Sequence, residues 1–183
     1  MIPFMNPLAN RSLGGRVRAM VGGILILTVS AGCGQPEAVG ALKRLKQAKS
    51  AAVAEIEARG GTATIKDYGP GSGYILDLRT VPIDDDFLAE LTPLKHITEI
   101  DLSDSDVTDE QLQKLAKVRG VGVILKLDVS GTQIGDAGIM AFVKHNLLCQ
   151  LDVQNSNVTP AAIKKFKKQH PVNMYKIPLE VKQ

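Results

Sequence analysis

Apolar and polar residues alternate in one short pattern that occurs four times between residues 73 and 158. Each copy places an aspartate between two apolar residues, and a polar corner with a further apolar residue follows. The copies span residues 73–83, 97–107, 124–134 and 148–158, and their central aspartates, Asp77, Asp101, Asp128 and Asp152, lie 24, 27 and 24 residues apart. This alternation predicts a short strand in each copy, with pairs such as Leu76 and Leu78 pointing inward and the aspartate pointing outward. A regular period of this length indicates stacked repeats.

A helix is predicted after each strand. The helical segments are residues 85–91, 109–117, 136–143 and 160–168, with apolar faces formed by Leu88 and Leu91, Leu112 and Leu115, Ile139 and Phe142, and Ile163 and Phe166. Thr108 and Gln111 have the spacing of a capping box, and Thr159 stands before Pro160 at a first helical position. The longest period holds its three extra residues within 118–123, where glycines predict a bulging loop.

The spacing of the repeated unit, I-x-x-I-x-L-x-x-S-x-V in residues 97–107, is similar to that of the leucine-rich repeat family in its bacterial and ribonuclease-inhibitor-like variants. The resemblance covers residues 73 to about 168 and implies an α/β solenoid, with parallel strands on a concave face and helices on the convex face. At the corner position where the family has asparagine, this chain has Val81, Ser105, Thr132 and Ser156. A hydroxyl can bond the corner backbone and valine cannot, so we expect the first corner to differ.

The flanking sequence predicts covers for the two open ends of such a solenoid. Residues 35–61 predict an amphipathic helix with apolar residues at helical spacing, namely Val39, Leu42, Leu45, Val53 and Ile56. We favour a cap packed on the solenoid over a helix lying on a lipid surface, an alternative that nearby basic residues leave open. Residues 62–68 and a turn at 69–73 predict a hairpin, and residues 171–178 predict a closing strand that Pro178 ends.

The first residues resemble a bacterial lipoprotein signal peptide. A leader with three arginines precedes an apolar run at residues 20–29, and Ser30-Ala-Gly-Cys33 follows. The run is shorter than the roughly 20 residues of a spanning helix, so we expect processing and a lipid on Cys33, which would hold the protein on the extracytoplasmic side of a membrane. An uncleaved signal anchor, ordinary secretion and a start at Met5 stay open. Lipidation would leave Cys149 without a disulfide partner, as a buried small hydrophobe.

We therefore divide the chain into a signal peptide at residues 1–32, a lipid anchor with the N-terminal cap at 33–72, and a repeat domain with its C-terminal cap at 73–183. Composition adds little to this division. With 44% hydrophobic and only 4% aromatic residues, the core must be aliphatic. The net charge of +3 comes from Arg11, Arg16 and Arg18 in the leader, so it gives no reason to expect a nucleic-acid partner.

Parallel strands would align the four aspartates in one outward row. At a strand spacing of about 4.8 Å, neighbouring carboxylates would repel by roughly 1 to 3 kcal/mol, which Arg79, Lys126, backbone amides of the corners or a cation must offset. We favour a scaffold ladder over Ca²⁺, which needs six or more oxygens. We therefore expect no metal, and no cofactor or catalytic residue, because no motif pairs a nucleophile with a base.

The best candidate for function is the concave face, which we expect to hold a protein or envelope partner. The candidate binding residues are Asp77, Arg79, Glu99, Asp101, Ser103, Lys126, Asp128, Ser130, Asp152 and Gln154. A self-associating structural scaffold without a dedicated ligand is the alternative, and an enzyme is the least favoured class.

Overall fold

The computed structural model describes residues 36–69, 71–171 and 178–183. The chain separates into two units, residues 1–35 and residues 36–183, and only the second is described. Every core residue in the described part lies between Ala52 and Phe166. The unit from Pro36 onward thus carries its own core and is expected to fold without residues 1–35.

The elements of this unit are α1 (Pro36–Ala58), β1 (Thr62–Asp67), β2 (Ser72–Asp77), α2 (Asp85–Glu90), β3 (Ile97–Asp101), α3 (Asp109–Leu115), η1 (Arg119–Val123), β4 (Lys126–Asp128), α4 (Asp136–Met140), β5 (Gln150–Asp152), α5 (Pro160–Gln169) and β6 (Glu180–Lys182).

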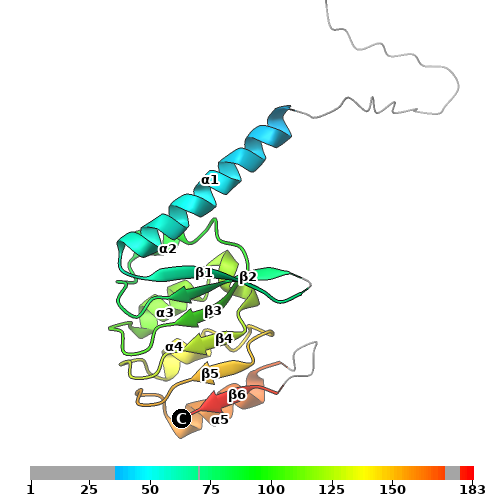
Figure 1. Cartoon of the computed structure of the whole chain (residues 1–183). Coiled ribbons are helices and arrows are strands. Elements are labelled where there is room, and N and C mark those ends of the chain that lie inside the picture. The colour runs from blue at the N-terminus through cyan, green and yellow to red at the C-terminus, as the bar shows by residue number, and fades with distance from the viewer. Residues whose placement is uncertain (1–35, 70, 172–177) are drawn as a thin grey trace, which may run out of the picture. The chain divides into compact units, whose positions relative to one another are not determined.

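The strands form one sheet in chain order, from β1 to β6 (Figure 1). The hairpin predicted for the N-terminal end is confirmed, because β1 pairs antiparallel with β2. All the other pairs are parallel, and the helices α2 to α5 make the return crossings on one side of the sheet. The predicted α/β solenoid with strands on one face and helices on the other is confirmed.

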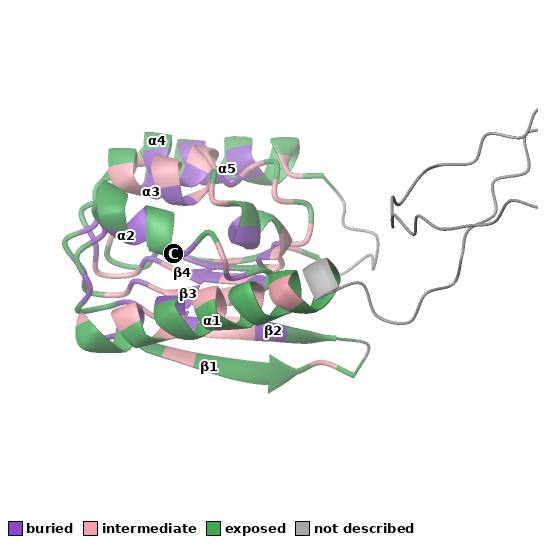
Figure 2. Ribbon diagram, turned by 90° about the horizontal axis from the view of Figure 1, so that it is seen from above, coloured by how far each residue is buried: buried purple, intermediate pink, exposed green. Residues whose placement is uncertain are grey.

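The core is an aliphatic column between sheet and helices, where buried residues gather in Figure 2. The inward strand residues Leu76, Ile100, Leu127 and Leu151 are neighbours in register and are at most 2% exposed. Three phenylalanines complete the core on the side of the helices: Phe87, Phe142 and Phe166 are fully buried. Phe87 is the one of these three that the sequence pattern missed.

The predicted helix starts are confirmed. In α3 the Gln111 side chain accepts from the Thr108 amide at 2.9 Å, and Gln111 N–H donates to the Thr108 hydroxyl at 3.4 Å, which completes a capping box. The Thr159 hydroxyl accepts from Ala162 N–H at 3.1 Å at the start of α5. The helices α2, α3 and α4 end one to three residues before their predicted ends, and tight turns follow them.

Two connections differ from the sequence expectation. Residues 119–123 form the 3-10 helix η1 and not a bulging loop, because the buried Gly120 and Val121 draw the insertion against the core. The prediction that Pro178 ends the closing strand is wrong, since β6 begins after Pro178, at Glu180. Proline lacks the N–H that a ladder needs, whereas Glu180 N–H donates to Cys149 O at 2.8 Å. The rest of the predicted strand, residues 172–177, lies outside the described residues.

Helix α1 caps the solenoid with only its second half. Ala52 and Ile56 are fully buried against the core, but Val39 and Leu42 are 65% and 55% exposed. The first half of α1 extends away from the strands (Figure 1). The helix is therefore longer than the cap requires.

Candidate functional site

The predicted row of aspartates exists on the concave face of the sheet. Asp77, Asp101, Asp128 and Asp152 are neighbours in register on β2, β3, β4 and β5. They form the last residue of each of these strands, so the row marks the line where strands turn into corners. Whether a partner touches this row stays a prediction.

Each aspartate of the row bonds its own corner. Its Oδ1 accepts from the backbone N–H two residues later, at 3.3 Å from Arg79, 2.9 Å from Ser103, 3.1 Å from Ser130 and 3.2 Å from Gln154. The hydroxyls of Ser103 and Ser130 each donate to the same oxygen at 2.7 Å. These donors offset the repulsion between neighbouring carboxylates. The row is thus a structural ladder, and the two serine hydroxyls are already used within it.

Two cations stand at the two ends of the row. Arg79 donates twice to Asp77, with Nε–Oδ1 3.0 Å and Nη2–Oδ2 2.7 Å, and it lies 3.9 Å from Asp101. The hydrogen bonds from Arg79 lower the pKa of Asp77, and Asp77 in turn raises the pKa of Arg79. Lys182 of β6 lies 3.4 Å from Asp152, a pair that sequence reasoning missed because it misplaced the last strand.

A second row of outward side chains runs beside the aspartates, two residues earlier on each strand. Its members are neighbours in register: Ile75, Glu99, Lys126, Gln150 and Glu180. Each differs in chemistry from the next, in contrast to the uniform aspartate row. Sequence reasoning found Glu99 and Lys126 and missed the other three, although their spacing from the aspartates would have located Ile75 and Gln150.

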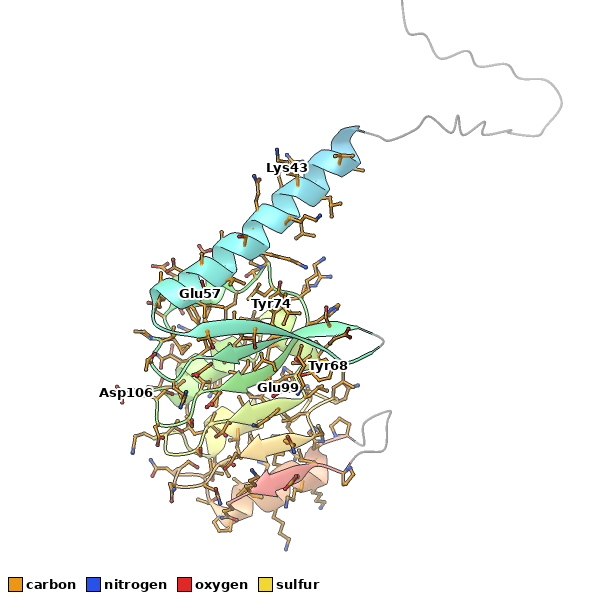
Figure 3. The ribbon with its side chains drawn as sticks, in the orientation of Figure 1. Lys43, Glu57, Tyr68, Tyr74, Glu99 and Asp106 are labelled. Atoms are coloured by element: carbon orange, nitrogen blue, oxygen red, sulfur yellow. The ribbon has the colours of Figure 1, made fainter. Side chains whose placement is uncertain are left out.

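Glu99 is the centre of a small polar cluster in the second row. Tyr68 donates to Glu99 Oε1 at 2.7 Å, Lys66 donates to the same oxygen at 3.2 Å, and the Tyr68 and Thr98 hydroxyls are 3.2 Å apart. Figure 3 shows Tyr68 beside Glu99. Lys66 pairs in register with Gly73, and a Cβ on Gly73 would overlap the Thr98 side chain, so glycine allows Thr98 to pack closely against β2.

The cluster fixes the charge of Glu99. Burial alone would raise its pKa, but the hydrogen bonds from Tyr68 and Lys66 outweigh burial and lower the pKa. Burial raises the pKa of the Tyr68 phenol, which therefore stays protonated and donates its hydrogen bond. The first strands thus present a fixed carboxylate flanked by an exposed ammonium group.

A small recess lies at the end of the second row that is far from Glu99, on β4, β5 and β6. It has a volume of about 180 Å³ and is lined by Lys126, Gln150, Leu151, Asp152, Glu180 and Lys182. Gln150 Nε2 lies 3.5 Å from Glu180 Oε2, at the limit of a hydrogen bond. The recess has the size of one or two side chains and offers both charge signs together with an amide.

The corners repeat a backbone feature that the sequence reasoning also missed. The third residue after each of three aspartates has a positive φ: 56° at Asp104, 69° at Gly131 and 55° at Asn155. Aspartate, asparagine and glycine are the residues that tolerate this conformation best, so their recurrence was a readable signal. The same backbone turn thus ends β3, β4 and β5 at the border of the concave face.

The first corner differs from the others, as expected from Val81. Hydroxyls of Ser105, Thr132 and Ser156 donate to backbone carbonyls three residues earlier at 2.6, 2.6 and 2.7 Å. Val81 instead packs in the core at 4% exposure. The Thr80 hydroxyl donates to Gly60 O at 3.0 Å and joins this corner to the N-terminal cap.

The remaining candidate chemistry is sparse. The described residues contain no group of three or more His, Cys, Asp or Glu side chains that could hold a metal ion. The Cys149 thiol is half-buried and donates to Leu125 O at 3.3 Å, and burial raises its pKa, so it is a poor nucleophile. Within the part of the chain that the structure covers, no helix has the length and apolarity to cross a membrane.

Comparison with known proteins agrees with the geometry. The sequence profile described as Leucine Rich repeat matches residues 94–116 and 124–143, which contain β3 with α3 and β4 with α4. No curated protein matches the chain. Proteins of this family are in general interaction modules and not enzymes, and their repeats generally bind other proteins. The two matched segments are similar to leucine-rich repeats, and the strand, corner and helix repeated around them form a short α/β solenoid of the kind that such repeats build.

Proposed function

We propose that this protein is a lipid-anchored leucine-rich repeat module that binds a protein partner on the extracytoplasmic side of a membrane, through its concave face. The observation that carries the proposal is the second row, where a fixed carboxylate, an ammonium group, an amide and another carboxylate stand side by side on neighbouring strands. Stacking between repeats fixes the inward residues of a solenoid, so its outward residues must determine which partner binds.

The second row supports binding better than the aspartate row does. Asp77, Asp101, Asp128 and Asp152 hold their own corners, so their hydrogen bonds are largely committed. Among the described residues, Lys126 forms no ion pair and Glu180 has only the long contact with Gln150. A polar partner segment could therefore bond these groups without breaking the scaffold. Ser103, Ser130 and Gln154 would serve as the rim of the site.

The anchor is proposed from the sequence alone. Cys33 follows a short apolar run and the small residues Ser30, Ala31 and Gly32, which suits a lipoprotein cleavage site. Residues 1–35 lie outside the described residues. Intact-mass analysis of protein extracted from membranes tests this part, and a mature chain that starts elsewhere or carries a free thiol at Cys33 would refute it.

The binding site is tested by cross-linking in the native cell, followed by capture with variants. Lys126→Glu reverses the charge at the middle of the second row, and Lys165→Glu makes the same change on the exposed side of α5. We expect Lys126→Glu to reduce capture of the cross-linked partner at least tenfold, and Lys165→Glu to leave it unchanged. Unfolding curves of both variants must match the parent protein. Capture that survives Lys126→Glu but fails with Lys165→Glu would place the site on the convex side.

A self-associating scaffold is the second candidate, favoured by one observation. β1 is the edge of the sheet, and its Ile65 is 66% exposed, which is a feature of strands that pair with another chain. Light scattering of the soluble part from Gly34 onward separates the two candidates. A monomer at working concentrations supports the binding module, and an oligomer that Ile65→Lys disperses supports the scaffold.

A further inference from the structure

The first half of α1 has no partner among the described residues. Figure 1 shows this part of the helix extending beyond the strands, and Figure 3 shows Lys43 on it, away from the sheet. Val39 and Leu42 are mostly exposed, while Ala52 and Ile56, further along the same helix, are fully buried. A cap would need only the buried half, so the exposed half requires another explanation.

Apolar and basic residues are paired along this exposed half. Val39, Leu42 and Leu45 are three residues apart and share one side of the helix. A lysine follows each of them by four residues, at Lys43, Lys46 and Lys49, and therefore lies one turn further along the same side. Long lysine side chains placed in this way can keep their ammonium groups in a polar layer while their stems and the aliphatic residues enter an apolar one.

The charge of this segment is mainly positive. Every charged residue from 38 to 54 is basic, namely Lys43, Arg44, Lys46 and Lys49, and the acidic residues of α1 lie at its two ends, with Glu37 in the first turn and Glu55 and Glu57 where the helix meets the solenoid. Lys43, Arg44 and Lys46 are exposed. The helix thus has its positive charge and its unpaired apolar side chains at the same end.

We infer that the exposed half of α1 lies on an anionic phospholipid surface and fixes the orientation of the solenoid above it. A second copy of the chain is a poorer occupant, because two such helices pairing side by side would bring their basic segments together, in either direction. An anionic surface instead complements the charge and accepts Val39, Leu42 and Leu45 at its apolar boundary. A helix of 15 residues, from 36 to 50, is about 22 Å long, enough to lie along such a surface for four turns.

This inference rests on the proposed lipid anchor for its place in the cell. Only Gly34 and Gln35 separate Cys33 from the first residue of α1, so an anchored chain would begin its helix next to the lipid headgroups. A single acyl chain gives marginal binding, and a basic segment is a usual second signal. The anchor and the helix would then act together, with the concave face held at a defined tilt.

The test uses the soluble part from Gly34 to Gln183, which contains the whole described core and lacks Cys33. Its binding is measured by co-sedimentation with vesicles of phosphatidylcholine alone and of equal parts phosphatidylcholine and phosphatidylglycerol. We expect at least tenfold tighter binding to the anionic vesicles. Each basic residue near an anionic surface contributes roughly a factor of five, so Lys43→Glu with Lys46→Glu should weaken binding by about 25-fold or more.

Matched changes elsewhere on the chain serve as controls. Lys167→Glu with Lys168→Glu alters the same number of charges on α5, where both lysines are exposed, and should change binding by less than about twofold. Leu42→Gln should weaken binding by about tenfold, and Ile65→Gln, at a similarly exposed residue of β1, should not. All four variants change exposed side chains, and circular dichroism verifies that they stay folded.

Three results would overturn the inference. Equal binding to both kinds of vesicle would remove the charge argument, and equal losses in the α1 and α5 variants would show unspecific attraction to lysine. A chain that ignores vesicles but forms a dimer, which Leu42→Gln dissociates, would make a second copy the occupant. The anchor fails separately, because only intact mass reports on Cys33. An unmodified Cys33 with a vesicle-binding helix refutes the anchor alone.

Discussion

Gly120 offers the sharpest test of the packing of the inserted residues. It lies in η1, buried between α3 and β4. A Cβ at this position would overlap the backbone carbonyl oxygen of Leu94 well inside 3.0 Å, and it would stand 3.0 Å from Ile97 Cδ1. Gly122, two residues later in the same short helix, has nothing within 4 Å of the equivalent point. Neither glycine has a positive φ, so the two alanine variants differ only in their surroundings.

The expected cost of Gly120→Ala follows from this geometry. Restoring an ordinary carbon–oxygen separation requires the Leu94 backbone or η1 to move by about 1 Å or more, and Leu94 and Ile97 are both fully buried. Overpacking a buried site costs typically 1–3 kcal/mol, and a carbonyl fixed in the backbone relaxes less easily than a side chain, so we expect about 3 kcal/mol. Gly122→Ala should lie between neutral and about 1 kcal/mol stabilising, because alanine restricts the unfolded chain.

Urea denaturation followed by circular dichroism measures both variants on the part from Gly34 onward. The midpoint should fall for Gly120→Ala at an unchanged slope, and it should hold or rise for Gly122→Ala. Equal effects, or a loss confined to Gly122→Ala, would show that η1 does not pack against Leu94 as described. A reduced slope for Gly120→Ala would mean instead that the insertion unfolds separately from the solenoid.

Further expectations concern the row, a buried histidine and a core position. Leu102→Ala should lower the free energy of unfolding by about 2 to 5 kcal/mol in urea, because Leu102 is fully buried. Ser103→Ala should lower it by at most about 1 kcal/mol, because the Ser103 hydroxyl bonds a partly exposed carboxylate. Equal losses would show that the inward and outward positions of this strand are assigned wrongly by one residue. Arg79→Ala should raise the pKa of Asp77 in an NMR titration, because it removes the hydrogen bonds that lower this pKa. An unchanged pKa would show that Arg79 and Asp77 do not pair as described. Burial lowers the pKa of His145 in the folded protein below the unfolded value of about 6.5, so the unfolded chain binds the proton first, and the free energy of unfolding falls as the pH drops below about 6.5. His145→Gln, which keeps an N–H donor, should flatten this acid-side decline, and an unchanged decline would assign it to other groups.

The sequence by itself determined the repeat and most of its local structure. Strand alternation depends on residues two apart and helix capping on residues three apart, and both distances are within one short segment. Leu76 and Leu127 are therefore inward as predicted, and the Thr108 capping box forms as predicted. The row of aspartates followed as well, because identical repeats that stack in parallel must bring equivalent residues into register.

Only the tertiary structure decided which outward groups meet. Lys66 and Tyr68 reach Glu99 from 33 and 31 residues away, across a strand that has glycine at the crossing. Lys182 reaches Asp152 because the last strand forms after Pro178. Such contacts depend on how separate segments are aligned, and no local rule of spacing expresses that alignment. The extent of α1 beyond the core is of the same kind, since a helix pattern shows where a helix can run but not how much of it the rest of the chain covers.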